Sequence, residues 1–158
     1  MESNQWSKIR LIVTDFDGVW TDGKVIVSDK GSESVVCDRR DTLRIKEFVK
    51  RGGKLIVITQ ETNPVAAKRC RKMGIKCFSG CDDKWPLLQR LLESEGVRLQ
   101  EVAYVGDDIN DLVCLQSVGF PITVADGNPK CQAVARHVTI RRGGDGAIRE
   151  ILDLILDP

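Results

Sequence analysis

The sequence predicts an α/β fold: a three-layer, Rossmann-like, mainly parallel sheet with helices on both faces and a small β-hairpin insertion. Two observations carry this prediction. Short runs rich in Val, Ile and Leu alternate along the chain with segments of helical periodicity. The first of these runs, Ile9 to Val13, is almost continuously apolar, as expected of a central strand that is covered on both faces.

A β-hairpin is predicted over about residues 24–37. Its two β-rich runs, 24–28 and 34–37, flank the turn sequence Asp29-Lys30-Gly31. No other insertion between the predicted elements is large enough to cover a site at the end of the first strand. The sequence therefore predicts no separate cap domain.

The remaining elements follow from periodicity and from Gly and Pro at the boundaries of helices. Gly52-Gly53 ends one helical pattern, while Pro64 and Gly74 bracket the next. We expect helices over residues 41–51, 64–73, 84–95, 110–116, 129–135 and 146–156, and strands over residues 55–59, 75–78, 101–105, 121–124 and 138–140.

The composition is that of one compact globular domain, and we expect residues 1–158 to form a single domain. Of these residues 42% are hydrophobic and 30% are charged, which is enough to build a full core. The 24 basic and 23 acidic residues nearly cancel, so neither nucleic acid nor a membrane surface is an expected partner. Because no apolar segment has the form of a signal peptide or the ~20 residues of a membrane span, we expect a cytoplasmic protein that acts on a small molecule.

The cysteines and the single histidine do not indicate a zinc site or a disulfide framework. No two cysteines form a Cys-x-x-Cys pair, and His137 is the only histidine. We expect reduced, structural thiols, and His137 is predicted to be a polar residue at a strand end and not a general base. The cysteines are Cys37, Cys70, Cys77, Cys81, Cys114 and Cys131.

Two carboxylates, two residues apart, directly follow the first predicted strand in Asp15-Phe16-Asp17-Gly18. A strand that ends in Asp-x-Asp-Gly is typical of a phosphoryl-transfer site. Asp15 is the candidate nucleophile, because a carboxylate can attack phosphorus to give an aspartyl phosphate. Asp17 would first protonate the leaving oxygen and later activate water, which requires a pKa above that of Asp15.

A second acidic cluster, Gly106-Asp107-Asp108 with Asp111, follows a later apolar strand. The repulsion among these carboxylates requires a cation or a dedicated hydrogen-bond network to relieve it. A carboxylate that approaches a dianionic phosphate also needs a hard cation between them. Asp15, Asp107 and the backbone carbonyl of Asp17 offer the oxygen ligands that Mg²⁺ prefers, so Mg²⁺ is the expected cofactor. Asp108 and Asp111 are expected to be outer or weak ligands.

Thr59, Gln60 and Lys84 are the candidate phosphate-binding residues. Thr59 would contribute its hydroxyl, the strand end before Gln60 would contribute backbone amides, and Lys84 would contribute a positive charge at a helix start. Alone, Lys84 would more often be an ordinary surface charge. The carboxyl ends of parallel strands, however, meet at one edge of a sheet, where ligands bind.

Together, the segments Asp15-Phe16-Asp17-Gly18-x-x-Thr21-Asp22, Ile58-Thr59, Lys84 and Gly106-Asp107-Asp108-Ile109-Asn110-Asp111 resemble the haloacid dehalogenase superfamily of phosphatases, over nearly the whole chain. The short hairpin and the Gly-rich segment 142–150 look most like the capless phosphatases of 3-deoxy-D-manno-octulosonate 8-phosphate and of nonulosonate (sialic-acid-type) 9-phosphates. These enzymes belong to lipopolysaccharide or sialic acid biosynthesis. The resemblance implies a homotetramer in which hairpins meet at the centre and a neighbouring subunit covers the active site.

Two departures from the family pattern concern the substrate. The chain has Ile58-Thr59-Gln60-Glu61 where the octulosonate enzymes typically have Ile-Thr-Gly-Arg. Glu61, followed by Arg69 and Lys72 on the next predicted helix, looks more like the nonulosonate 9-phosphate members, although a solvated lysine is equally ordinary there. Trp20 stands where Leu is usual, and it either walls the pocket or packs at the base of the hairpin.

Two other classes of protein share parts of this pattern. One is a tetramerising or regulatory phosphatase-like domain related to that of acylneuraminate cytidylyltransferases, but its inactive versions would lack Asp15. The other is the phospho-receiver domain, which takes its phosphate on an Asp after a middle strand, where this chain has Thr59. We therefore expect a free-standing, Mg²⁺-dependent phosphoric monoester hydrolase.

Overall fold

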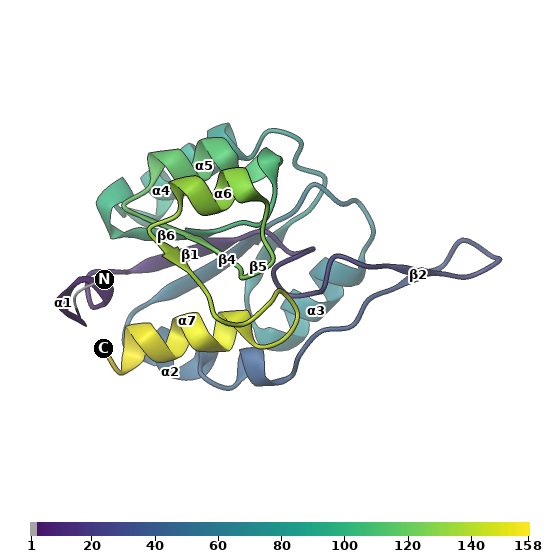
Figure 1. The fold of residues 1–158 in the computed structure, drawn as a ribbon, viewed down its shortest axis with the longest axis horizontal. Coiled ribbons are helices and arrows are strands. Elements are labelled where there is room, and N and C mark those ends of the chain that lie inside the picture. The colour runs from purple at the N-terminus through teal and green to yellow at the C-terminus, as the bar shows by residue number, and fades with distance from the viewer. Residues whose placement is uncertain (1–2) are drawn as a thin grey trace.

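The computed structural model describes residues 3–158 and has a six-stranded sheet at its centre (Figure 1). The strands lie in the order β5-β4-β1-β6-β7-β8, and every neighbouring pair is parallel. This confirms the predicted parallel, Rossmann-like sheet. The strands are β1 (Leu11–Thr14), β4 (Lys54–Ile58), β5 (Lys76–Phe78), β6 (Val102–Val105), β7 (Phe120–Thr123) and β8 (His137–Val138).

Helices cover both faces of the sheet and form the predicted three layers (Figure 1). Along β1, Ile12 packs into the core on one face, whereas Leu11 and Val13 pack into the core on the other. This double burial explains why the strand is continuously apolar. One face carries α2 (Ile45–Lys50), α3 (Val65–Met73) and α7 (Ala147–Leu156), and the other carries α4 (Lys84–Glu95), α5 (Leu112–Ser117) and α6 (Pro129–Val134).

A short helix that the sequence analysis did not predict, α1 (Ser3–Trp6), precedes the sheet. The Trp6 ring is buried and meets the His137 ring edge-on, with centroids 5.2 Å apart, on the edge strand β8. His137 is therefore a polar residue of an edge strand, as predicted. The six cysteines are free thiols. No helix in the described part of the chain is both long enough and apolar enough to cross a membrane.

The predicted hairpin is present, but its paired part is shorter than predicted. Only β2 (Ile26–Val27) and β3 (Glu33–Ser34) pair, in antiparallel register. The hairpin extends away from the sheet (Figure 1), and a two-stranded ribbon with no layer to pack on makes few hydrogen bonds. Apolar side chains at Ile26, Val27 and Val36 consequently stay more than half exposed.

Among the helices and the strands after the hairpin, three elements differ from the prediction by more than one residue at an end. The helix expected over 41–51 is a 3₁₀ turn, η1 (Arg40–Thr42), followed by the shorter α2, because Asp41 turns inward instead of continuing the helix. The helix expected over 110–116 begins as a 3₁₀ turn, η3 (Ile109–Asp111), before α5. The last strand ends at Val138 and not at residue 140, since the Thr139 hydroxyl donates to the Arg141 carbonyl and turns the chain.

A side chain from a distant segment caps the C-terminal helix α7. Its N-cap residue is Gly146, which has no side chain to satisfy the first amides of the helix. The carboxylate of Asp41, fully buried in η1, accepts the amide of Arg149 at 2.9 Å instead. Burial raises the pKa of Asp41 to about 6 in spite of this hydrogen bond.

The Gly-rich segment before α7 packs against the loop that follows β1. The Gly144 amide donates to the Val19 carbonyl at 3.0 Å, and a Cβ on Gly143 would lie only 1.8 Å from the Gly18 carbonyl oxygen. Only glycine permits this approach of two backbones. The segment thereby fixes the loop that carries Asp15 and Asp17.

We expect Asp41 to make stability depend on pH. Its folded pKa of about 6 lies above the unfolded value of 3.8, so its contribution to stability is present below pH ~4 and is lost as pH rises through 6. Relative to Asp41→Asn, the wild type should gain about 2 kcal/mol of unfolding free energy between pH 7.5 and pH 4, at 1.36 kcal/mol per pKa unit, since the unfolded state is partly protonated at pH 4. Urea unfolding of both proteins across this range measures the difference, and a constant difference would contradict the assignment.

Candidate active site

Three adjacent strands, β4, β1 and β6, bring the predicted site residues to one edge of the sheet. Asp15 directly follows β1, and its amide donates to the Val105 carbonyl at 2.9 Å, so the sheet itself holds it in place. Thr59 directly follows β4, and Asp107 lies two residues beyond β6. An open cavity of about 460 Å³ lies over this edge, lined by Asp15, Asp17, Gly18, Gly23, Thr59, Gln60, Glu61, Asp107, Asp108, Ile109 and Asn110.

Lys84, the first residue of α4, contacts Asp15 at this edge of the sheet. Asp83 caps the helix by accepting the Trp85 amide, which fixes where Lys84 enters. The Lys84 side chain is fully buried, with Nζ 2.6 Å from Asp15 Oδ2 and 2.8 Å from Asp111 Oδ1. Burial alone would lower the pKa of Lys84, but the charges of Asp15 and Asp111 raise it above its usual value. The ammonium therefore stays charged.

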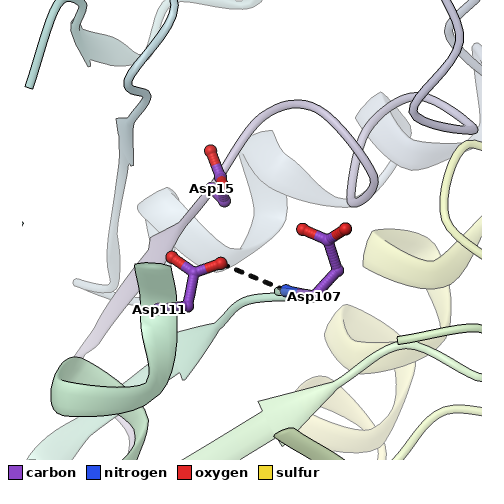
Figure 2. Close-up of side chains that lie close together, drawn as sticks. All are labelled: Asp15, Asp107 and Asp111. Carbon is purple, nitrogen blue, oxygen red and sulfur yellow. Dashed lines mark hydrogen bonds between the residues drawn. The ribbon is translucent and has the colours of Figure 1, made fainter. Parts of the chain in front are cut away.

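Asp15, Asp107 and Asp111 form a compact carboxylate cluster (Figure 2), with one oxygen from each lying within 4.8 Å of the others. Burial, followed by repulsion from Asp111, raises the pKa of Asp15 to about 7. Burial and the charge of Asp15 likewise raise the pKa of Asp107 to about 7. Lys84 contacts only Asp15 and Asp111, so one ammonium cannot neutralise the three carboxylates. This oxygen-rich, electron-rich set fits a hard divalent cation such as Mg²⁺.

Asp111 differs from the other two carboxylates because three donors contact its oxygens, whereas Asp15 is contacted by two, the Phe16 amide and Lys84 Nζ. Oδ1 accepts from Lys84 Nζ at 2.8 Å and from the Tyr104 hydroxyl at 2.7 Å, and Oδ2 accepts from the Asp107 amide at 3.2 Å. The carboxylate is completely buried. The sequence analysis missed Tyr104, because a tyrosine inside an apolar strand gives no signal of its partner.

Asp17 lines the same cavity as Asp15 and Asp107 and is bound by the turn that follows it. The Thr21 hydroxyl donates to Asp17 Oδ1 at 3.3 Å and accepts the amides of Gly18 and Gly23. Burial raises the pKa of Asp17, while the hydrogen bond from Thr21 opposes the rise. Thr21, part of the motif but given no role from the sequence, thus sets the position of Asp17.

Gly18 allows Asp107 to reach the cluster. A Cβ at this position would lie 1.9 Å from Asp107 Oδ2, and the backbone φ of +79° also favours glycine. The loop after β1 and the loop after β6 consequently pack face to face.

The residues at the rim of the cavity form their own hydrogen bonds. The Thr59 hydroxyl accepts the Glu61 amide at 3.2 Å, and Gln60 Nε2 donates to Asp82 Oδ1 at 3.2 Å. Asp108 caps η3 by accepting the Ile109 amide at 2.8 Å. Thr59 and Asp108 thus shape the loops that surround the carboxylates.

The three residues predicted to contact substrate are not brought together within this chain. Glu61 lines the main cavity and also a second cavity of about 180 Å³ beneath the hairpin. Arg69 and Lys72, farther along α3, line neither of these two cavities among the described residues.

Trp20 resolves one alternative left open by the sequence. Its side chain is buried, and Nε1 donates to the Thr14 hydroxyl at 2.8 Å. It packs in the core on the α7 face of the sheet and does not wall the cavity. This hydrogen bond joins the two residues that flank the loop of residues 15–19.

Comparison with known proteins shows the family of the chain. A family model for haloacid dehalogenase-like hydrolases matches residues 59–151. The 3-deoxy-D-manno-octulosonate 8-phosphate phosphatase KdsC of Yersinia pestis is 33% identical over 151 residues, which cover 95% of this chain and 81% of that protein.

Solved structures show the same likeness. The octulosonate phosphatase of Moraxella catarrhalis, in complex with magnesium, phosphate and KDO, superposes with a TM-score of 0.93 at 33% identity, covering 98% of this chain and 90% of that one. A cobalt-bound phosphatase of the same type from Haemophilus influenzae has a TM-score of 0.91 at 31% identity, covering 97% and 90%.

The chain therefore belongs to the haloacid dehalogenase-like hydrolase family. Within that family it is a phosphatase, a phosphoric monoester hydrolase similar to the octulosonate 8-phosphate phosphatases.

Gly18→Ala should displace Asp107 and weaken Mg²⁺ binding by at least about 10-fold, because a cation held by carboxylates needs their oxygens in place. Gly74→Ala is the matched control: its φ is +74°, but no atom lies within 4 Å of the added Cβ. Both variants should lose about 1–3 kcal/mol of stability from backbone strain. Calorimetric titration with Mg²⁺ separates them, and equal Mg²⁺ affinities would refute the close packing of Gly18 on Asp107.

Proposed function

We propose that this chain hydrolyses the phosphate ester of a 3-deoxy-2-ulosonic acid through an aspartyl phosphate on Asp15. The observation that carries the proposal is the contact of Lys84 Nζ with Asp15 Oδ2 at 2.6 Å, beside a carboxylate cluster. The Phe16 amide donates to Asp15 Oδ1 at 2.6 Å, so both oxygens of Asp15 are held in place in the lining of an open cavity. A nucleophile needs this kind of defined position. We also propose that residues 1–158 work as one phosphatase domain.

In the first step, an oxygen of Asp15 attacks phosphorus and the bond from phosphorus to the sugar oxygen breaks. Asp17 donates its proton to that leaving oxygen, so the product is a neutral alcohol. Burial raises the pKa of Asp17, which favours the protonated form that this step requires. Burial also raises the pKa of Asp15 to about 7, so a bound cation would have to keep Asp15 ionised.

In the second step, water attacks the phosphorus of the aspartyl phosphate. Asp17, now ionised, takes a proton from that water, and the bond between phosphorus and Asp15 breaks. Inorganic phosphate leaves, and both aspartates return to their starting states. The hydrogen bond from Thr21 would keep Asp17 in one position through both steps.

Mg²⁺ would be held by Asp15, Asp107 and the Asp17 carbonyl, with Asp108 and Asp111 outside the first set of ligands. When bound, it would supply positive charge that keeps the carboxylates ionised and offsets the charge of the phosphate. The hydrogen bonds that already occupy Asp111 support this division, because a carboxylate with three donors is poorly available to a cation.

The phosphate would be bound by the Thr59 hydroxyl, the strand-end amides around Gln60 and the charge of Lys84. Thr59 accepts a hydrogen bond from the Glu61 amide, which leaves its own hydroxyl proton available to a phosphate oxygen. Lys84 is the only cation that contacts the described carboxylate cluster in the ion pairs of this structure. The positive charge of its ammonium, close to the phosphoryl group, would stabilise the negative charge of the transition state.

The substrate proposal is a phosphorylated ulosonic acid of eight or nine carbons. It rests on the octulosonate phosphatases to which the chain is similar. Glu61 lines the cavity, so we propose that it contacts the sugar. Arg69 and Lys72 lie farther along α3. They would contact a substrate bound to a neighbouring subunit, or a substrate long enough to extend from the cavity to this part of α3.

We propose a homotetramer in which the hairpins meet. The exposed apolar residues Ile26, Val27 and Val36 support this arrangement, because exposed apolar clusters mark protein contacts.

Light scattering should give four times the mass of one chain, and Ile26→Glu should lower that mass. The matched control Leu43→Glu changes a residue of the same 66% exposure on another element and should not.

We predict Mg²⁺-dependent phosphate release from octulosonate 8-phosphate, from nonulosonate 9-phosphate or from both, with a preference for the nine-carbon acid if Glu61 selects the substrate. Asp15→Asn should lower kcat by more than about 1,000-fold, because nucleophile and cation site are both damaged. Glu61→Gln should change the ratio of the two kcat/KM values, which reports differential transition-state binding.

The outcomes separate the parts of this proposal. Wild-type phosphate release by Asp15→Asn would refute the aspartyl phosphate. A preference for the octulosonate ester would make Glu61 peripheral to selection. No turnover of either ester with Mg²⁺ present would favour the regulatory phosphatase-like domain instead.

A further inference from the structure

Tyr104 is a buried polar residue to which the proposed mechanism gives no part. It is the single tyrosine of the chain and lies on β6, next to the central strand. Its side chain is 0% exposed. Its hydroxyl donates to Asp111 Oδ1 at 2.7 Å. The Tyr104 hydroxyl therefore binds the same carboxylate oxygen as Lys84.

The surroundings of Tyr104 do not require a hydroxyl. The ring packs in an apolar cluster with residues such as Leu88 and Leu115, and the other residues of β6 are Val102, Ala103 and Val105. A phenylalanine would fill the same space. A buried hydroxyl is stable only with a partner, and here the partner is Asp111.

A continuous chain of short contacts leads from Tyr104 to the nucleophile. Tyr104 donates to Asp111 Oδ1, the same oxygen accepts from Lys84 Nζ at 2.8 Å, and Lys84 Nζ lies 2.6 Å from Asp15 Oδ2. The Asp107 amide donates to the other oxygen of Asp111 at 3.2 Å. Three donors in different directions fix the plane of the Asp111 carboxylate, and that plane determines where the ammonium lies.

We infer that Tyr104 is a positioning residue, whose hydroxyl holds Asp111 in the orientation that keeps Lys84 directed at Asp15. This inference rests on the proposed function, since Asp15 and Lys84 have the roles given above. Without the hydroxyl, the carboxylate of Asp111 keeps two of its three donors and can rotate. Lys84 then follows Asp111 and loses its alignment with the nucleophile.

The first test compares Tyr104→Phe with Thr139→Val. Thr139 is also a buried residue, and its hydroxyl donates to the Arg141 carbonyl at 2.6 Å, with no contact to Asp111. Tyr104→Phe should lower kcat by about 10- to 100-fold, the scale of a misplaced catalytic group, while KM changes less than kcat. Thr139→Val should keep wild-type kcat. Equal kcat values in wild type and Tyr104→Phe would overturn the inference and leave the proposed function standing.

The second test asks whether Tyr104 senses the ligands at the site. Because the chain has one tyrosine, labelling with 3-fluorotyrosine gives a single ¹⁹F resonance. Adding Mg²⁺ with inorganic phosphate should shift this resonance, since it changes the charge around Lys84, two contacts from Tyr104, and around Asp15, three contacts away. A resonance that does not move would overturn the inference. The test needs no turnover, so a protein inactive on both esters whose resonance still shifts would refute the proposed function alone.

Discussion

The buried ammonium of Lys84 is the feature on which the site depends. It lies between Asp15 and Asp111 with its side chain wholly excluded from solvent. A buried ion pair adds little to stability, because desolvation offsets the attraction, whereas removal of one partner costs about 3–5 kcal/mol. Lys84 therefore acts mainly as an organiser. It joins α4 to the end of β1 and to the turn before α5, and so holds Asp15 against the sheet.

The remaining geometry follows from an excess of negative charge at that point. Asp107 enters the same space through the gap that Gly18 leaves open, and with Asp15 and Asp111 it forms a cluster that one ammonium cannot neutralise. Burial, followed by repulsion among the carboxylates, raises the pKa values of Asp15 and Asp107 to about 7, which reflects the electrostatic cost of keeping both ionised. A divalent cation relieves it, and a phosphate ester is the ligand that such a cation and a buried lysine jointly attract.

Much of the fold could be predicted from the sequence because the pattern of a doubly covered parallel strand is local. The same logic brought Asp15, Thr59 and Asp107 to one edge, since carboxyl ends of parallel strands must coincide. The partners of Asp111 and the inward turn of Asp41 could not be predicted. Both depend on segments far apart in the chain, and Tyr104 looks from the sequence like any large residue of a core strand.

The most direct test of the account is rapid acid quenching of wild-type protein during turnover of a ³²P-labelled ulosonic acid phosphate, followed by peptide mapping. The account predicts a labelled protein that forms and decays within one turnover, requires Mg²⁺, and carries its phosphate on Asp15. Turnover without any labelled protein, or label on another residue, would contradict the central claim that Asp15, held by Lys84, is the nucleophile.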